Sequence, residues 1–248
     1  MIEDEIHLGI MEGNLDRMIP QIMHMRYCQE YSPQTIQRFL ESGLNQAIER
    51  YNLCHNQLDG KMTKLTNGYK AEFGTKKYNL RDLTNAGKIF KQASQMLESY
   101  MPTDFEKIKE EGIIGIGTMV NHHFIGRTVI QQKLRFSGYL CYELGSKLKT
   151  KDFINAAQEY NLDVIGISLM ANTKQVKPLN EFKRFLDKLD STPLEKNVQI
   201  LIGGQAKDLK DYLSHPRVHQ IKDIDMVPYF TQFLVETARS SYKHKTHN

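Results

Sequence analysis

The spacing of apolar residues changes once along the chain, near residue 101, and this change constrains the fold more than any other feature. Before that point apolar residues recur every three or four positions, as in amphipathic helices. They fall into four groups: Ile6, Ile10, Met11; Met18, Ile22, Met25; Ile36, Phe39, Leu40, Leu44; and Leu83, Ile89, Phe90, Ala93, Leu97. Four helices are therefore predicted, with Ser32-Pro33 and Asn79 as favourable starts for the third and fourth. The polar segment 59–77 predicts a long loop between these two helices.

Beyond Met101-Pro102-Thr103-Asp104, short β-branched runs alternate with amphipathic stretches. We expect strands at 113–118, 139–144, 164–169, 198–202 and 218–221, and helices at 127–136, 151–160, 179–189, 206–213 and 227–238. Such alternation is typical of parallel βαβ units. The proline disfavours continuation of the preceding helix, so the predicted boundary separates a helical domain, residues 1–104, from an α/β domain, residues 105–248. The expected fold is an N-terminal helical bundle followed by a flavodoxin-like, doubly wound, five-stranded parallel sheet.

Composition excludes several classes of protein. Hydrophobic residues make up 40% of the chain and charged residues 25%, as in ordinary globular proteins, and the formal charge of +4 requires no polyanionic partner. Direct nucleic-acid binding is not expected. The acidic start and the lack of a long apolar run predict a cytoplasmic protein without membrane association. Cys28, Cys54 and Cys141 are odd in number and widely spaced, which argues against a disulfide framework or a thiolate zinc site.

Ligands of open parallel sheets bind beyond the carboxyl ends of the strands, so the loops there are the first places to inspect. Three are unusual: 117–126 carries two adjacent histidines, 166–173 is rich in small residues, and 202–205 contains a glycine pair. Two familiar motifs do not fit them. Val120 stands where a dinucleotide-binding loop needs its third glycine, and Met170 stands where a nucleophile elbow needs glycine.

Together these loops resemble the cobalamin-binding domain of corrinoid methyl-transfer proteins and of cobalamin-dependent methionine synthase. That family has D-x-H-x-x-G after the first strand, S-x-L after the third and G-G after the fourth. Here the motifs read Asn121-x-His123-x-x-Gly126, Ser168-Leu169-Met170 and Gly203-Gly204, in the same order. The helical half is similar to the four-helix cap that precedes this domain, so the resemblance covers nearly the whole chain.

The resemblance implies a cobalamin cofactor with His123 as the lower axial ligand of cobalt, and a neutral imidazole is a suitable donor for that metal. The predicted cofactor-binding residues are Thr118, Asn121, His123, Gly126, Ser168, Leu169, Gly203 and Gly204. Small residues among them would leave room for the nucleotide tail, and the Ser168 hydroxyl would add a hydrogen-bond donor. His122 is interpreted as a bystander.

The chain departs from the family at Asn121, where a carboxylate is expected, and the segment 118–123 is one residue shorter than usual. A carboxylate hydrogen-bonded to a ligand histidine raises the basicity of the imidazole, and asparagine adds no charge. The departure therefore predicts a weaker bond between His123 and cobalt. The alternatives are a pocket that binds cobalamin without histidine ligation, one that binds heme, and one that binds nothing.

Two functions are consistent with these residues. The first is a corrinoid carrier in a methyltransferase system, with no catalytic residues of its own and a methyltransferase as partner protein. The second is a sensor in which cobalamin or heme changes the docking of the cap against the sheet and thereby the contact with a regulatory partner protein. A homo-oligomer is compatible with either function.

Overall fold

The structure is a computed structural model that describes residues 2–27, 31–56, 78–101, 111–122, 124–169, 176–194, 197–204, 209, 212–221 and 223–243. It divides into two compact units, residues 1–101 and 102–248. The predicted loop 59–77 lies outside the described residues, as do His123 and Met170. No helix in the described part of the chain is both long and apolar enough to span a membrane.

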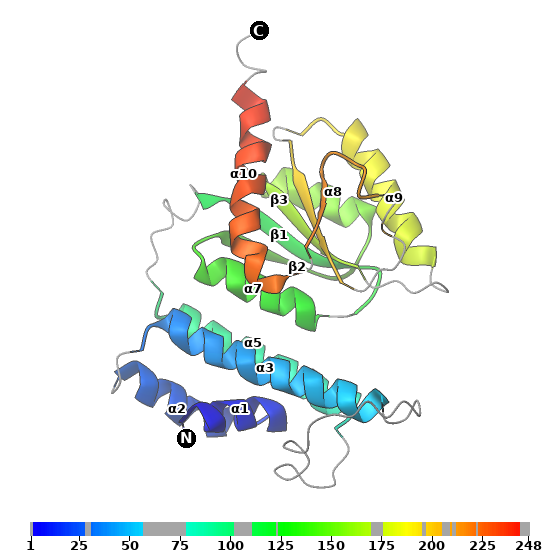
Figure 1. Cartoon of the computed structure of the whole chain (residues 1–248). Coiled ribbons are helices and arrows are strands. Elements are labelled where there is room, and N and C mark those ends of the chain that lie inside the picture. Colours follow the sequence, from blue (N-terminus) through cyan, green and yellow to red (C-terminus); the bar gives the residue numbers. More distant parts are fainter. Residues whose placement is uncertain are drawn as a thin grey trace. The chain divides into compact units, whose positions relative to one another are not determined.

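The first unit contains four described helices, as predicted: α1 (Ile2–Glu12), α2 (Leu15–Tyr27), α3 (Pro33–Asn56) and α5 (Leu80–Glu98). Helix α1 packs against the other three (Figure 1). The predicted start of α5 is confirmed, because the Asn79 side chain accepts hydrogen bonds from the backbone of Arg81 and Asp82. The start of α3 is confirmed too, since the Ser32 hydroxyl accepts a bond from the Thr35 N–H, at 3.1 Å.

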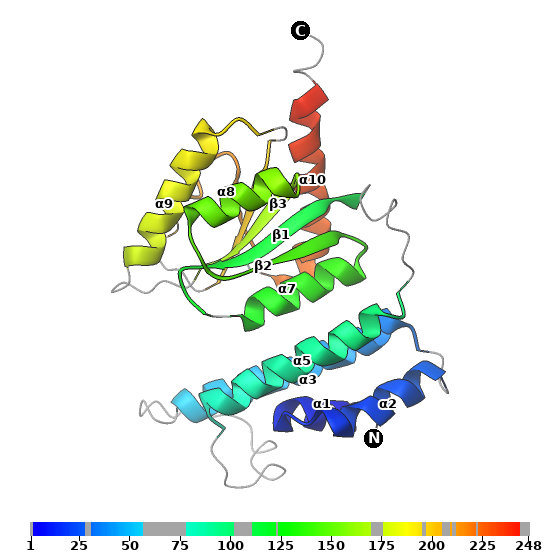
Figure 2. The same ribbon diagram turned by 180° about the vertical axis from the view of Figure 1, so that it is seen from behind.

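The second unit is a five-stranded, all-parallel sheet, which confirms the predicted fold class. The strands are β1 (Ile113–Met119), β2 (Leu140–Leu148), β3 (Val164–Ser168), β4 (Gln199–Gly203) and β5 (Val218–Gln220), in the order β2-β1-β3-β4-β5. Helices α8 (Thr150–Glu159) and α9 (Val176–Ser191) cover one face, while α7 (Ile125–Phe136) and α10 (Val227–Lys243) cover the other (Figures 1 and 2). A short 3₁₀ helix, η1 (Ile224–Met226), precedes α10.

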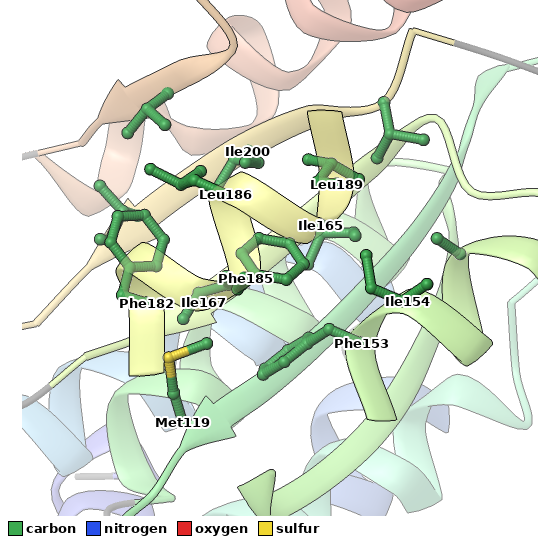
Figure 3. Close-up of a cluster of buried hydrophobic side chains, with 14 of the residues drawn as sticks. Met119, Phe153, Ile154, Ile165, Ile167, Phe182, Phe185, Leu186, Leu189 and Ile200 are labelled. Atoms are coloured by element: carbon green, nitrogen blue, oxygen red, sulfur yellow. The ribbon is translucent and has the colours of Figure 1, made fainter. Parts of the chain in front are cut away.

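Apolar clusters on both faces of the sheet explain why its strands read as continuous hydrophobic runs. On the face of α8 and α9, Phe153, Phe182 and Phe185 pack over Ile165 and Ile167 (Figure 3). On the face of α7 and α10 the cluster is more aliphatic. Its buried members are Ile114, Ile116, Leu134, Tyr139, Cys141, Val164, Leu201, Val227, Leu234 and Val235.

A buried carboxylate fixes the amino edge of the sheet. Asp163 is fully buried and accepts hydrogen bonds from Arg239 Nε at 3.0 Å, from Arg239 Nη2 at 2.9 Å and from the Ile113 N–H at 2.8 Å. These bonds join the start of β1 to the later part of α10. Because α10 runs back toward the amino edge, it begins at the carboxyl edge, where the predicted ligand loops lie.

One element differs from the sequence-based expectation. Strand β2 continues to Leu148 rather than ending at residue 144, because Gly145 adopts a left-handed backbone (φ +108°) and the pairing with β1 shifts register there. Most of the predicted helix 206–213 lies outside the described residues. Of the described ones, Tyr212 and Leu213 both donate a backbone hydrogen bond to the Leu209 carbonyl.

Candidate functional site

Three of the predicted residues form one row across the carboxyl edge of the sheet. Thr118 of β1 is the register partner of Ser168 of β3, and Ser168 is the register partner of Gly203 of β4. Side chains alternate along a strand, and Ile116 and Leu201, two positions earlier, belong to the cluster under α7 and α10. The row therefore faces α7 and α10, and it ends that apolar cluster with small or hydroxylated residues.

The glycines at 126 and 203 leave open space that the fold itself does not use. A Cβ on Gly126, in the first turn of α7, would meet no atom within 4 Å, and one on Gly203 would meet only Ile130 Cδ1, at 3.9 Å. Neither glycine adopts the left-handed backbone that favours this residue. Glycine in a helix costs about 1 kcal/mol relative to alanine. Each of these glycines would allow a group to approach its backbone closely, as a cofactor tail does.

Gly204 has a different role from its neighbour. Its φ is +108°, and a Cβ there would clash with the backbone carbonyl of Leu169. The Leu169 N–H donates a hydrogen bond to the Gly203 carbonyl at 2.9 Å, so the backbones beyond β3 and β4 lie against each other. The Leu169 side chain is fully buried in the cluster under α8 and α9, on the face opposite the row. Leu169 and Gly204 therefore shape the edge through their backbones.

The loop that carries the histidine motif is joined to the end of β2 by two backbone hydrogen bonds. The Val120 N–H donates to the Leu148 carbonyl at 3.1 Å, and the Lys147 N–H donates to the Asn121 carbonyl at 3.0 Å. Val120 and Lys147 both have left-handed backbones, with φ of 66° and 59°. This conformation is strained for a β-branched residue. Asn121 is half-buried and His122 is exposed.

An ion pair at the start of α7 was not anticipated from the sequence. Arg127 is 5% exposed, and its guanidinium donates to Glu143 Oε1 at 2.8 Å and to Ser146 Oγ at 3.1 Å, both on β2. Burial lowers the pKa of Arg127, and the Glu143 charge opposes this shift. The pair fixes the first helical turn after the motif against β2. The signal in the sequence was weak, because a basic residue near a helix start usually lies in solvent.

Several known proteins resemble this chain in sequence or in fold. No family model matches the chain. A dimethylamine corrinoid protein of Methanosarcina acetivorans is 30% identical over 111 residues, which are 44% of this chain and 49% of that protein. The chain thus spans about half the length of this relative.

Two solved structures share the fold. The monomethylamine corrinoid protein of Methanosarcina barkeri superimposes with a TM-score of 0.62 over 94% of this chain and 98% of its own, at 15% identity. The methanol:cobalamin methyltransferase complex of the same organism contains a chain that superimposes with a TM-score of 0.51, at 16% identity, over 100% of this chain and 85% of its own. The resemblance to corrinoid proteins that three short motifs indicated is thus confirmed, by sequence over about half of the chain and by fold over nearly all of it.

Proposed function

We propose that this protein binds a corrinoid at the carboxyl edge of its sheet and acts in the cytoplasm as a methyl carrier for partner methyltransferases. The observation that carries the proposal is the row Thr118, Ser168 and Gly203, in which the fold does not need the open space above Gly203. The names of the sequence relatives support the choice of cofactor. A related fold in a methanol:cobalamin methyltransferase complex supports the choice of partner.

Each residue at the edge has a role in this proposal. His123 would supply the imidazole that holds cobalt, and the Ser168 hydroxyl would donate a hydrogen bond to the nucleotide tail. Gly126 and Gly203 would leave room for the tail between the sheet and α7. Arg127 and Glu143 would hold the start of α7 in place. When bound, the corrinoid supplies a cobalt centre that accepts and releases a methyl group, while the partners supply the substrate chemistry.

Asn121 is the residue at which this chain departs from the family motif, which has aspartate there. A carboxylate in this position would raise the electron donation of a neighbouring imidazole, and a neutral amide orients the ring without adding charge. We therefore propose that His123 binds cobalt more weakly than the histidine of a motif with aspartate would. The same residue favours the second candidate, a cobalamin- or heme-responsive sensor, because a sensor depends less on a tuned lower ligand than a carrier does.

Absorption spectroscopy tests the proposal directly. The purified chain and its His123→Ala variant are titrated with hydroxocobalamin and, separately, with hemin. Stoichiometric cobalamin binding, with a spectrum that changes in the variant, supports ligation by His123. Methylation of the bound corrinoid by a corrinoid methyltransferase then supports the carrier, and cobalamin binding that no such enzyme can methylate supports the sensor. Binding of hemin but not of cobalamin contradicts the carrier function.

A further inference from the structure

An apolar stripe on α10 lies exposed beside the edge strand β5. Met226, at the end of η1, is 51% exposed, and Tyr229 and Phe233 on α10 are 72% and 54% exposed. Their spacing of three and four places them on one side of the helix. With Ile221 and Phe230 they line an open groove of about 440 Å³. Contiguous apolar surfaces of this kind on soluble proteins mark interaction sites.

Side-chain size changes along this stripe. Its first half carries the large residues Met226, Tyr229 and Phe233, whereas helical spacing continues it with the small residues Thr237 and Ser240. Large side chains at one end and small ones at the other complement each other when two identical helices run in opposite directions. A parallel pair would instead place aromatic residues against aromatic residues and small residues against small ones.

Charge changes in the same direction. Asp223 and Asp225 precede α10, with Asp225 already paired to Lys133 at 2.9 Å, whereas the sequence has Lys243 as the last residue of α10 and Lys245 two positions later. In an antiparallel pair the acidic start of each helix meets the basic end of the other, and such complementarity fixes orientation. The size gradient and the charge gradient thus select the same arrangement independently.

We propose that this surface binds a second copy of the chain, through antiparallel packing of α10 on α10 with the two-fold axis near Phe233. Residues equally distant from Phe233 then face each other. Tyr229 of one copy packs on Thr237 of the other, Met226 on Ser240, and Asp223 lies near Lys243. This contact is isologous, so it closes as a dimer. The dimer requires no cofactor, so its test does not depend on the proposed function.

The expected dimer is weak and depends on protein concentration. Helix α10 has 17 residues and is therefore about 25 Å long. A pair of helices of this length buries an area near the lower end of specific interfaces, about 1,200 Å² in total. The aromatic residues at the centre should dominate its stability.

Sedimentation velocity across a concentration series of the full chain tests the dimer. The wild-type chain should shift from monomer to dimer, and Phe233→Glu should raise the dissociation constant about 30-fold or more. Leu80→Glu is the matched control, because Leu80 is a similarly exposed apolar residue, at 61%, in the other unit. It should dimerise like the wild type. A chain that stays monomeric throughout, or a Phe233→Glu variant that dimerises normally, overturns the proposal.

Cysteine cross-linking tests the orientation. Under mild oxidation Phe233→Cys should form a disulfide-linked dimer by itself, and a mixture of Tyr229→Cys and Thr237→Cys chains should form the mixed dimer. The unsubstituted chain gives the background from its own cysteines. Preferential self-cross-linking of Tyr229→Cys would indicate a parallel pair and overturn the proposed geometry. Lys243→Glu combined with Lys245→Glu should weaken the dimer more at low salt than at high salt, and an equal effect at both contradicts the proposed charge contact.

Discussion

Thr118 and Ser168 lie directly opposite each other on adjacent parallel strands, with both side chains on the face covered by α7 and α10. Gly203 continues this row on the next strand. Elsewhere on that face these strands present mainly apolar residues, among them Ile114, Ile116, Val164 and Leu201. The proposed ligand site depends on this row of small or hydroxylated residues, and Gly203 and its neighbour Gly204 provide the sharpest test of it.

Gly203 and Gly204 should respond to substitution in opposite ways. Gly203→Val places a side chain in open space, so the free energy of unfolding should change by less than about 1 kcal/mol, while cobalamin affinity should fall about tenfold or more. Gly204→Ala forces a side chain onto a left-handed backbone against Leu169 and should destabilise the protein by about 1–3 kcal/mol. Urea unfolding and cobalamin titration measure the two quantities. Equal cobalamin affinity in Gly203→Val and the wild type would contradict a tail site at the row.

Removal of Arg127 and removal of Glu143 should lower the free energy of unfolding by different amounts. Glu143→Gln leaves a guanidinium whose side chain is only 6% exposed without its charged partner, whereas Arg127→Met leaves a carboxylate whose side chain is 29% exposed and can be hydrated. We therefore expect Glu143→Gln to lower the free energy of unfolding by about 2 kcal/mol, and Arg127→Met to cost less. Chemical denaturation of both variants and of the double variant measures the difference. A larger loss in Arg127→Met would show that packing of the arginine stem, rather than charge, dominates.

Asp163→Asn should be among the most destabilising conservative changes in the sheet unit. The neutral amide cannot replace the carboxylate that bonds Arg239 and the Ile113 N–H in a fully buried position, so the expected cost is about 3–5 kcal/mol. Thermal and urea unfolding measure it. Asp187→Asn, the same change at an exposed position of α9, is the control and should lie within about 0.5 kcal/mol of the wild type.

His219 should make stability depend on pH. Its Nε2 lies 3.0 Å from Gln199 Oε1, its ring packs edge-on against Phe230, and burial lowers its pKa below the ordinary value of 6.5. The folded protein then binds fewer protons than the unfolded chain, so this contribution is complete above pH 6.5 and is lost as the pH falls through the lower folded pKa.

Because burial also lowers the pKa of His7 and His215, the comparison with a variant isolates His219. The difference in unfolding free energy between the wild type and His219→Gln should change between neutral pH and about pH 5 and stay constant above neutrality. A difference that does not vary with pH would show that His219 keeps its ordinary pKa in the folded protein.

The sequence predicted the described helices and two of their caps from local periodicity and local hydrogen bonds, and it predicted the parallel sheet from the alternation of strands with helices. The extension of β2 was missed because Gly145-Ser146-Lys147 has the composition of a turn. Its pairing depends on Val120 and Asn121, which lie more than twenty positions away in the chain.

Other features were missed for related physical reasons. Met226, Tyr229 and Phe233 have the same helical spacing as core residues, and periodicity alone cannot tell whether an apolar side is covered. The sequence gives no sign that Arg127 is buried, because both of its partners lie on β2. The sequence placed the three motifs at one edge, because the carboxyl ends of parallel strands share an edge, but the row Thr118, Ser168 and Gly203 depends on strand register, which the sequence does not give. The role of His123 remains a prediction.

The two bonds between the motif loop and the end of β2 use only main-chain atoms, so they do not depend on which side chains the loop carries. Evolution can therefore exchange residues such as Asn121 and keep the scaffold of the loop. Conversely, a change of backbone near Lys147 or Leu148 would alter the conformation of the motif loop without any substitution in the motif itself. Substitutions at the end of β2 are therefore a way to change the shape of this edge.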